Sequence, residues 1–163
     1  MIEIVILYIL SKYDATIYRL SKIIDEYFFA YLKSSTGTIS PALKRLEKLN
    51  CVDFEESMTK GGMLSKTYSI TPTGKKHLTE QLLTLKEPNP YHVLNTVKIA
   101  IYCSDSLSVN EIVEFKENLI SILEILKIKI EKGTSSEYVS LNEIQKQTIK
   151  ITMTEIESLI KLL

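Results

Sequence analysis

The spacing of apolar residues changes from a helical to an alternating pattern at about residue 51, and this change restricts the folds that the chain can adopt. Before that point apolar residues recur every three or four positions, as on one helix face: Ile39, Leu43, Leu46 and Leu49. After it they alternate with polar residues in two short runs, which contain Val52 and Phe54, and then Tyr68 and Ile70. Gly61 and Gly62 lie between the runs and are typical of a tight turn. The sequence therefore predicts a helix over 38–50, with Asn50 as its left-handed C-cap, and then a β-hairpin.

Three more helices are predicted in the first half of the chain. Residues 2–10 are apolar on almost every side, which predicts a buried first helix. A turn over 12–15, with Asp14 as the expected N-cap, leads into a second helix. The apolar face of this second helix comprises Ile17, Leu20, Ile24, Tyr27 and Phe28. After the hairpin, Thr71 and Pro72 are typical of a helix N-terminus, and they precede a stripe of Leu78, Leu82 and Leu85.

Pro88 and Pro90 interrupt the helical pattern, so we place a domain boundary there and divide the chain into residues 1–86 and 87–163. Two segments beyond it have the S-x-x-E form of a capping box, beginning at Ser108 and at Ser140. Each precedes an apolar stripe with alternating steps of three and four: Ile112, Phe115, Leu119, Ile122 and Leu126, then Ile149, Met153, Ile156, Ile160 and Leu163. This spacing suits helices that pack lengthwise in a coiled coil. Because the first of these helices is apolar on several sides, we expect a second copy of the chain to cover it and these ten residues to form a dimer interface.

The formal net charge of zero conceals an asymmetry along the chain. Residues 1–78 contain eleven Lys and Arg against eight Asp and Glu, a balance of +3, and residues 79–163 have a balance of −3. The positive excess is concentrated in 33–76, which contains eight basic against four acidic residues. A local basic excess on a neutral protein is typical of a nucleic-acid contact surface.

Other classes of protein find little support in the sequence. The apolar run Ile4–Leu10 is much shorter than the roughly 20 residues of a membrane span, and no signal-peptide pattern precedes it. Two cysteines and two histidines occur without metal-ligand or catalytic spacing: Cys51, Cys103, His77 and His92. We therefore expect a cytoplasmic protein that is not an enzyme and that uses no cofactor or metal.

The segment Ser35-Thr-Gly-Thr-Ile-Ser-Pro-Ala-Leu-Lys-Arg-Leu-Glu47 resembles the third-helix pattern of the PadR family of bacterial transcription regulators. Further matches are Tyr18-x-Leu20, Lys66-x-Tyr68-x-Ile70-Thr71 and Gly74, so the resemblance covers about residues 4–78. It implies a fold that is mainly α with a small β-hairpin, an N-terminal winged helix-turn-helix that binds duplex DNA. Residues 88–163 resemble the C-terminal helical domain of the virulence-activator-like subgroup, which forms an antiparallel, coiled-coil-like homodimer.

The resemblance also implies a function, a sequence-specific regulator that acts as a homodimer on a pseudo-palindromic operator. Many members of the family respond to a small-molecule effector near the dimer interface, and the resemblance allows one here without identifying it. This chain departs from the family at the third helix, where Ser40 replaces the usual tyrosine, and before Tyr18, where Ile17 replaces a glycine. In the wing, Met63, Leu64 and Ser65 occupy positions that are rich in arginine in many members.

The residues expected to contact DNA follow from helical geometry together with this resemblance. With Ile39, Leu43 and Leu46 facing inward, the third helix turns the following residues outward: Thr38, Ser40, Pro41, Lys44, Arg45 and Lys48. Ser35 and Thr36 join Thr38 at the helix N-terminus, where hydroxyls and backbone N–H groups suit a phosphate. Tyr18 on the second helix and Lys60 and Lys66 in the wing complete the predicted interface.

Each of these residues has a plainer interpretation. The lysines are equally consistent with a solvated surface, the hydroxyls with a helix cap, and Tyr18 with the edge of the core. The alternative function is a protein-interaction adaptor that has lost DNA binding. It is favoured by the neutral net charge, by Ser40 and by the apolar pair Met63 and Leu64 at the wing tip.

Overall fold

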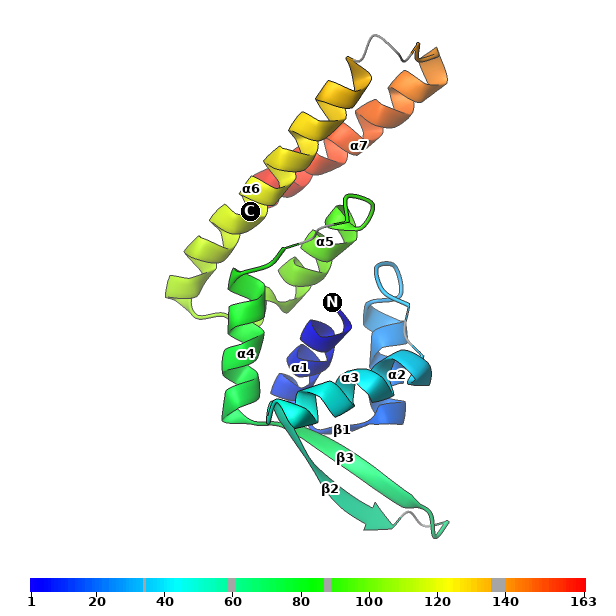
Figure 1. Ribbon diagram of the computed structural model, residues 1–163, viewed down its shortest axis with the longest axis vertical. Coiled ribbons are helices and arrows are strands. Elements are labelled where there is room, and N and C mark those ends of the chain that lie inside the picture. The colour runs from blue at the N-terminus through cyan, green and yellow to red at the C-terminus, as the bar shows by residue number, and fades with distance from the viewer. Residues whose placement is uncertain (34, 59–60, 87–88, 136–139) are drawn as a thin grey trace.

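The computed structural model describes residues 1–33, 35–58, 61–86, 89–135 and 140–163. The elements follow one another in the order α1 (Ile2–Lys12), β1 (Ala15–Thr16), α2 (Ile17–Tyr27), α3 (Thr36–Lys48), β2 (Val52–Met58), β3 (Leu64–Ile70), α4 (Pro72–Leu83), α5 (Val93–Cys103), η1 (Ser104–Ser106), α6 (Val109–Thr134) and α7 (Glu143–Leu162). Figure 1 shows α1–α4 gathered above a projecting hairpin, with the long antiparallel pair α6 and α7 at the opposite end and α5 between. The predicted fold class, mainly helical with a small antiparallel sheet, is confirmed.

Helix α1 forms the centre of the core. Val5, Ile6 and Leu7 are fully buried, and α3, α4, α5 and β3 all pack against the helix. A helix that is apolar on every side is stable in water only when neighbours cover it all round. The prediction of a buried first helix is confirmed.

The start of α2 differs from the prediction. Asp14 is not the N-cap, because Ala15 and Thr16 form a short strand, β1, that pairs with Tyr68 and Thr67 of β3. Because the backbone of this strand is extended, α2 begins only at Ile17, with Thr16 as its N-cap. The Thr16 hydroxyl accepts a hydrogen bond from the N–H of Arg19 at 3.3 Å. The sheet therefore has three strands, in the order β1-β3-β2.

Helix α3 begins at Thr36, two residues earlier than predicted, with Ser35 as its N-cap. Ile39, Leu43 and Leu46 are buried as predicted, but Leu49 is 52% exposed. The helix ends at Lys48, so Leu49 no longer follows the helical period and turns away from the core. Asn50 has a φ of 54°, which confirms it as the left-handed residue after the helix. Tyr27 of α2 is likewise exposed, contrary to its place in the predicted stripe, because the buried ring near that helix end is Phe28.

The hairpin is regular, with directly paired residues from Val52 and Ile70 at its base to Met58 and Leu64 near its tip. Gly62 in the connection has a φ of +77°, a conformation that glycine adopts without strain. Thr71 then caps α4 by accepting a hydrogen bond from the N–H of Gly74 at 3.0 Å, as predicted.

The capping box at Ser108 is confirmed, since its backbone N–H donates to the Glu111 carboxylate at 2.7 Å. The second capping box is displaced from its predicted position. Asn142, rather than Ser140, caps α7, and its N–H donates to Gln145 Oε1 at 2.9 Å. Asparagine is as good an N-cap as serine, and its own partner three residues later is a glutamine.

Helix α7 runs antiparallel to α6, and ion pairs join it to α6 and to α5. Lys127 of α6 pairs with Glu157 at 3.0 Å, and Lys98 of α5 pairs with Glu155. Within the described part of the chain, no helix is both long enough and apolar enough to cross a membrane.

The substitution Gly74→Ala should destabilise the folded protein, because a Cβ at this position would lie 2.0 Å from the carbonyl oxygen of Cys51. We expect a loss of about 3 kcal/mol in the free energy of unfolding, the upper range for overpacking a core. The measurement is urea denaturation at fixed protein concentration. Gly133→Ala is the matched control, since a Cβ there meets nothing within 4 Å and alanine favours the helix. Equal stability of the two variants would contradict the close packing of α4 on residue 51.

Candidate nucleic-acid interface

One side of α3 faces solvent along its whole length. At about 100° per residue, Gly37, Pro41, Lys44 and Lys48 lie opposite the buried stripe of this helix. We call these four residues the outward face of α3, and all four are exposed. Within the described residues, neither Lys44 nor Lys48 has an ion-pair partner, so both ammonium groups are available to a bound anion.

The two flanks of α3 are engaged with neighbouring elements. Arg45 lies on the flank toward α1, where its Nε donates to Glu3 Oε1 at 2.6 Å. Ser40 and Glu47 lie on the flank toward the hairpin. Burial, then the charge of Glu47 and a hydrogen bond with it, raise the pKa of Tyr68. Arg45 is therefore held at the edge of the predicted interface, a constraint that the sequence did not reveal.

Hydroxyl groups close the N-terminus of α3. The Thr38 hydroxyl accepts from the N–H of Ser35 at 3.1 Å and donates to the carbonyl oxygen of Ser35 at 2.9 Å. The interpretation of these residues as a helix cap is thus confirmed, and both remain exposed. The side chain of Thr36 lies outside the described residues.

Gly37 belongs to this surface although we did not predict it as a site residue. A Cβ added there would meet only Ser35 Oγ, at an ordinary 3.5 Å, so packing within the chain does not require a glycine. Its effect is to leave the first turn of the outward face without a side chain, where a ligand's backbone can approach closely. Its position in the motif around Ser35 was the available signal.

Tyr18 lies in the first turn of α2 and is 78% exposed, which rules out its interpretation as a core residue. The next residue, Arg19, is also exposed, and its guanidinium lies 5.1 Å from the centre of the Tyr13 ring. Figure 1 shows this turn of α2 at the hairpin end of the molecule. Tyr18 therefore stays accessible beside α3, and Arg19 adds a basic group that the sequence analysis missed.

The wing offers less positive charge than predicted. Lys66 Nζ lies 3.4 Å from the carboxylate of Glu56 and 3.6 Å from the centre of the Phe54 ring. This ammonium is thus already partly neutralised by its own chain. Lys60, the other predicted wing contact, lies outside the described residues.

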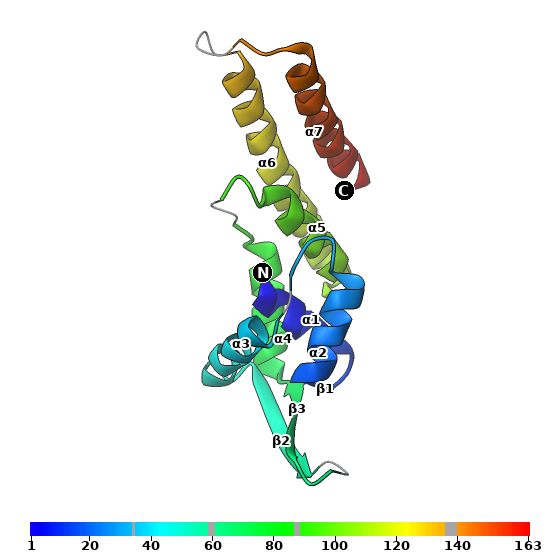
Figure 2. The ribbon, with the colours of Figure 1, turned by 90° about the vertical axis from the view of Figure 1, so that its right-hand side faces the viewer.

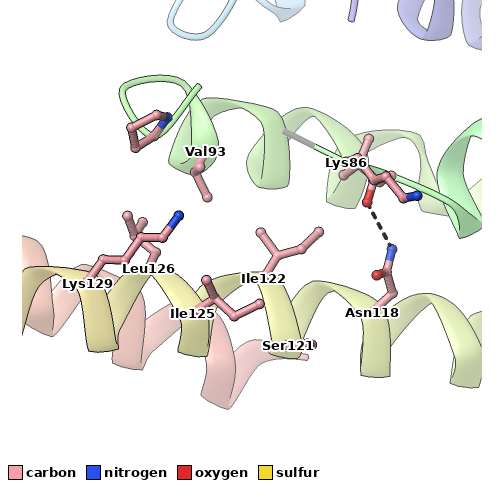
Figure 3. Close-up of a pocket in the computed structure, with 10 residues that line it drawn as sticks. Lys86, Val93, Asn118, Ser121, Ile122, Ile125, Leu126 and Lys129 are labelled. Carbon is pink, nitrogen blue, oxygen red and sulfur yellow. Dashed lines mark hydrogen bonds between the residues drawn. The ribbon is translucent and has the colours of Figure 1, made fainter. Parts of the chain in front are cut away.

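A pocket of about 270 Å³ lies between the chain after α4, the start of α5 and α6. Its walls are mainly apolar, and Figure 3 shows Ile122 and Leu126 between Lys86 and Lys129, which lie at opposite ends. Asn118 donates from its side chain to the carbonyl oxygens of Leu83 and Leu85, at 3.1 and 3.4 Å. An apolar slot with an ammonium group at each end suits a small amphipathic anion.

The ten predicted dimer residues lie where α6 and α7 pack within one chain or against the core. Four of them are buried in the single chain: Phe115, Leu119, Leu126 and Ile156. Ile149 is half-buried, and the others are half-buried and pack against the core: Ile112, Ile122, Met153, Ile160 and Leu163. Their role between two chains stays a prediction.

A second apolar stripe on α7 was missed in the sequence. Ile144, Ile151 and Leu162 are 76%, 70% and 66% exposed. They are seven and eleven residues apart, and so lie within about 20° of one another on the helix. This outer stripe of α7 lies about 120–140° around the helix from the buried Ile156, so α7 is apolar on two sides, and the described part of its own chain covers only one.

In the described ranges, no group of three or more His, Cys, Asp or Glu side chains could hold a metal ion. Burial, followed by the charge of Asp105, raises the pKa of Cys103 to about 12, so this thiol stays protonated at neutral pH.

A family model described as the transcriptional regulator PadR-like family matches residues 6–80. Among solved structures, a PadR family transcription regulator from hypervirulent Clostridium difficile is 33% identical, over 49% of this chain and 81% of that chain, with a TM-score of 0.43. Bacillus subtilis PadR in complex with operator DNA is 17% identical over 98% and 93%, with a TM-score of 0.49. The same protein in complex with p-coumaric acid is 18% identical over 98% and 92%, with a TM-score of 0.44.

No curated protein matches the sequence. The likeness of residues 88–163 to the virulence-activator-like subgroup stays a prediction, because the family match ends at residue 80.

Proposed function

Because this chain belongs to the PadR-like family of transcriptional regulators, we propose that it binds an operator through the outward face of α3 and does so as a homodimer. The observation that carries the proposal is the outward face itself. It presents Lys44 and Lys48 one helical turn apart, without partners in the described chain, on a helix whose opposite side is fully buried. Such a protein works in the cytoplasm, where bacterial DNA lies, and needs no catalytic group.

The geometry of α3 suits the major groove of B-DNA, which is about 12 Å wide and admits one α-helix. Lys44 and Lys48 would neutralise phosphates or donate to guanine, and Ser40, on the hairpin flank, would reach base edges. Gly37 would let the N-terminal turn of α3 approach a phosphate, and Tyr18 would contact the backbone from α2. Arg45, held by Glu3, would act at the margin of the groove.

The outer stripe of α7 is the surface that we propose for the dimer contact. Its three large apolar side chains are exposed to water in the single chain, and in a two-fold symmetric dimer the same stripe of a second copy would cover them. In a two-fold symmetric dimer, two α3 helices would enter successive major grooves at half-sites about 34 Å apart. Joining the two modules raises the effective concentration of the second one after the first has bound.

We further propose that the pocket beside α6 is an effector site. It lies where the predicted domains 1–86 and 87–163 meet, and its lining residues come from both. A ligand there would favour one angle between the hairpin half and the α6–α7 pair. It would therefore change the spacing of the two α3 helices in the dimer.

Replacing both Lys44 and Lys48 with alanine should weaken duplex binding and flatten its salt dependence. Each ammonium that contacts a phosphate contributes about one unit to the slope of log K against log salt, so four ammonium groups in a dimer should contribute about 3–4 units. The measurement is fluorescence anisotropy on a duplex from the region upstream of the chain's own gene, beside an unrelated duplex, at several salt concentrations.

The control variant is Lys132→Ala, which removes an exposed lysine in the last turn of α6, far from α3, and should leave the slope unchanged. An unaltered slope in the double variant would place the DNA contact on another surface. Absence of any salt-sensitive binding by the unmodified protein, even at low salt, would remove the proposed function altogether.

Ile144→Glu with Ile151→Glu should dissociate the dimer, because two buried charges without partners would cost several kcal/mol at the interface. Sedimentation velocity measures the outcome as a loss of the dimer peak at micromolar concentration. Leu49→Glu, at an apolar residue just after α3 that is 52% exposed, is the control and should leave the mass unchanged. A dimer that survives both α7 substitutions would move the interface away from the outer stripe.

Filling the pocket by Ser121→Trp should abolish ligand binding there. With p-coumaric acid as the probe, we expect the melting temperature of the unmodified protein to rise with ligand concentration, and that of the variant to stay constant. Lys129→Gln should lower the affinity about tenfold if the carboxylate lies beside this ammonium. If the ligand raises the melting temperature of the unmodified protein and of the Ser121→Trp variant equally, it binds elsewhere.

A further inference from the structure

The hairpin of β2 and β3 has two chemically different faces. Directly paired residues share a face, so one face carries Val52, Phe54, Glu56 and Met58 of β2 with Ile70, Tyr68, Lys66 and Leu64 of β3. The base of this face is core, since Val52 and Tyr68 are buried, and it packs beside Glu47 of α3. The opposite face carries Asp53, Glu55 and Ser57 with Ser69, Thr67 and Ser65.

The apolar character of the first face continues beyond the body of the protein. Met58 and Leu64 pair directly with each other and are 72% and 63% exposed, and the adjacent Met63 is 72% exposed. We call these three residues the apolar tip. Figures 1 and 2 both show this end of the hairpin projecting away from the helices, so none of the described helices covers it.

Charge is distributed so that this face can approach DNA. Glu56 is the acidic residue on the apolar face, and Lys66 beside it offsets its charge at 3.4 Å. Asp53 and Glu55 lie on the opposite face of the hairpin, although Asp53, at its base, also lines a hollow with Glu47 of α3. The face that adjoins the outward face of α3 thus presents no unpaired acid to phosphates, and it ends in large, flexible apolar groups.

Building on the proposed function, we propose that the apolar tip enters the minor groove beside each half-site as a wedge. Met and Leu are among the residues that proteins insert between base steps to unstack and kink a duplex. The occupant that fits is DNA, because the tip is continuous with the face of the hairpin that adjoins α3, and Glu56, the acid on that face, is paired with Lys66. Since the ammonium of Lys66 is engaged by Glu56, this apolar contact gives the described part of the wing a way to contribute affinity.

The wedge has consequences that differ from those of lysine contacts. Apolar insertion releases no counterions, so it raises affinity without changing the salt slope. It also favours pyrimidine–purine steps, which unstack at low cost, at a position that no side chain reads by hydrogen bonding. The operator should therefore contain a TA, CA or TG step outside each major-groove half-site.

The test uses a duplex that the full-length protein selects from a random pool, with 2-aminopurine replacing one adenine at a time. Unstacking raises the fluorescence of this base. We expect a rise at one step outside each half-site with the unmodified protein. Met58→Ser with Leu64→Ser should remove that rise and lower affinity about tenfold, as expected when two apolar side chains lose a desolvated contact. The salt slope should stay the same.

Two control variants separate the wedge from general damage to the hairpin. Ser57→Ala with Ser65→Ala alters the neighbouring pair on the opposite face and should behave as the unmodified protein. Met58→Leu with Leu64→Met exchanges the two side chains and should retain both signals. Circular dichroism should show that every variant is folded, because the substituted residues lie outside the core.

The wedge is wrong if no labelled position brightens, or if the double serine variant binds and brightens the duplex as the unmodified protein does. A changed salt slope in that variant would likewise contradict the wedge, because it would indicate that the tip contacts phosphates. These outcomes leave the proposed function intact, provided that salt-sensitive binding persists. If the unmodified protein selects no duplex at all, the proposed function and the wedge both fail, and the apolar tip becomes a surface for a protein partner.

Discussion

Helix α1 packs against α3, α4, α5 and β3, and because it is apolar on nearly every side the chain can bury it only by surrounding it. This requirement fixes which side of α3 is buried, and hence which side carries Lys44 and Lys48. The ion pair between Glu3 and Arg45 acts at the same contact and sets the rotation of α3 on α1. The candidate interface is thus a consequence of how the core is closed.

The same helix connects the interface with the C-terminal helices. Tyr8 of α1, Phe28 and Tyr102 of α5 form a chain of ring contacts, with centroid distances of 6.5 and 5.6 Å. Helix α5 also packs on α6, so a displacement of α6 would be transmitted to α1 through well-packed rings. The pocket beside α6 includes Val93 at the start of the same helix α5, so a ligand in the proposed effector site would act on the end of α5 opposite Tyr102. No separate linker is needed for such coupling.

Local patterns in the sequence predicted the elements well, and long-range contacts account for what they missed. The stripe of Ile39, Leu43 and Leu46 and the alternation in the hairpin are local properties, and the structure retains both. The strand at Ala15 exists only because β3 lies beside it, and Arg45 is held by a residue 42 positions away. Neither contact leaves a periodic signal. The outer stripe of α7 was missed because its spacing of seven and eleven residues is hidden by the stronger stripe that faces α6.

The distribution of charge constrains how tightly such a protein can hold DNA. Two unpaired lysines on each α3 release few counterions, and at a slope of about 0.9 per neutralised phosphate a dimer gains only a modest electrostatic term. Lys66 adds little to it, because Glu56 already offsets its charge. The proposed joining of two modules through α7 and the proposed apolar contact at the hairpin tip would add affinity that salt does not screen. Met58, Leu64 and Ile151 expose apolar surface to water in a free monomer, which is unfavourable. Binding of DNA and dimerisation would bury this surface, and this burial would account for large apolar side chains at these positions.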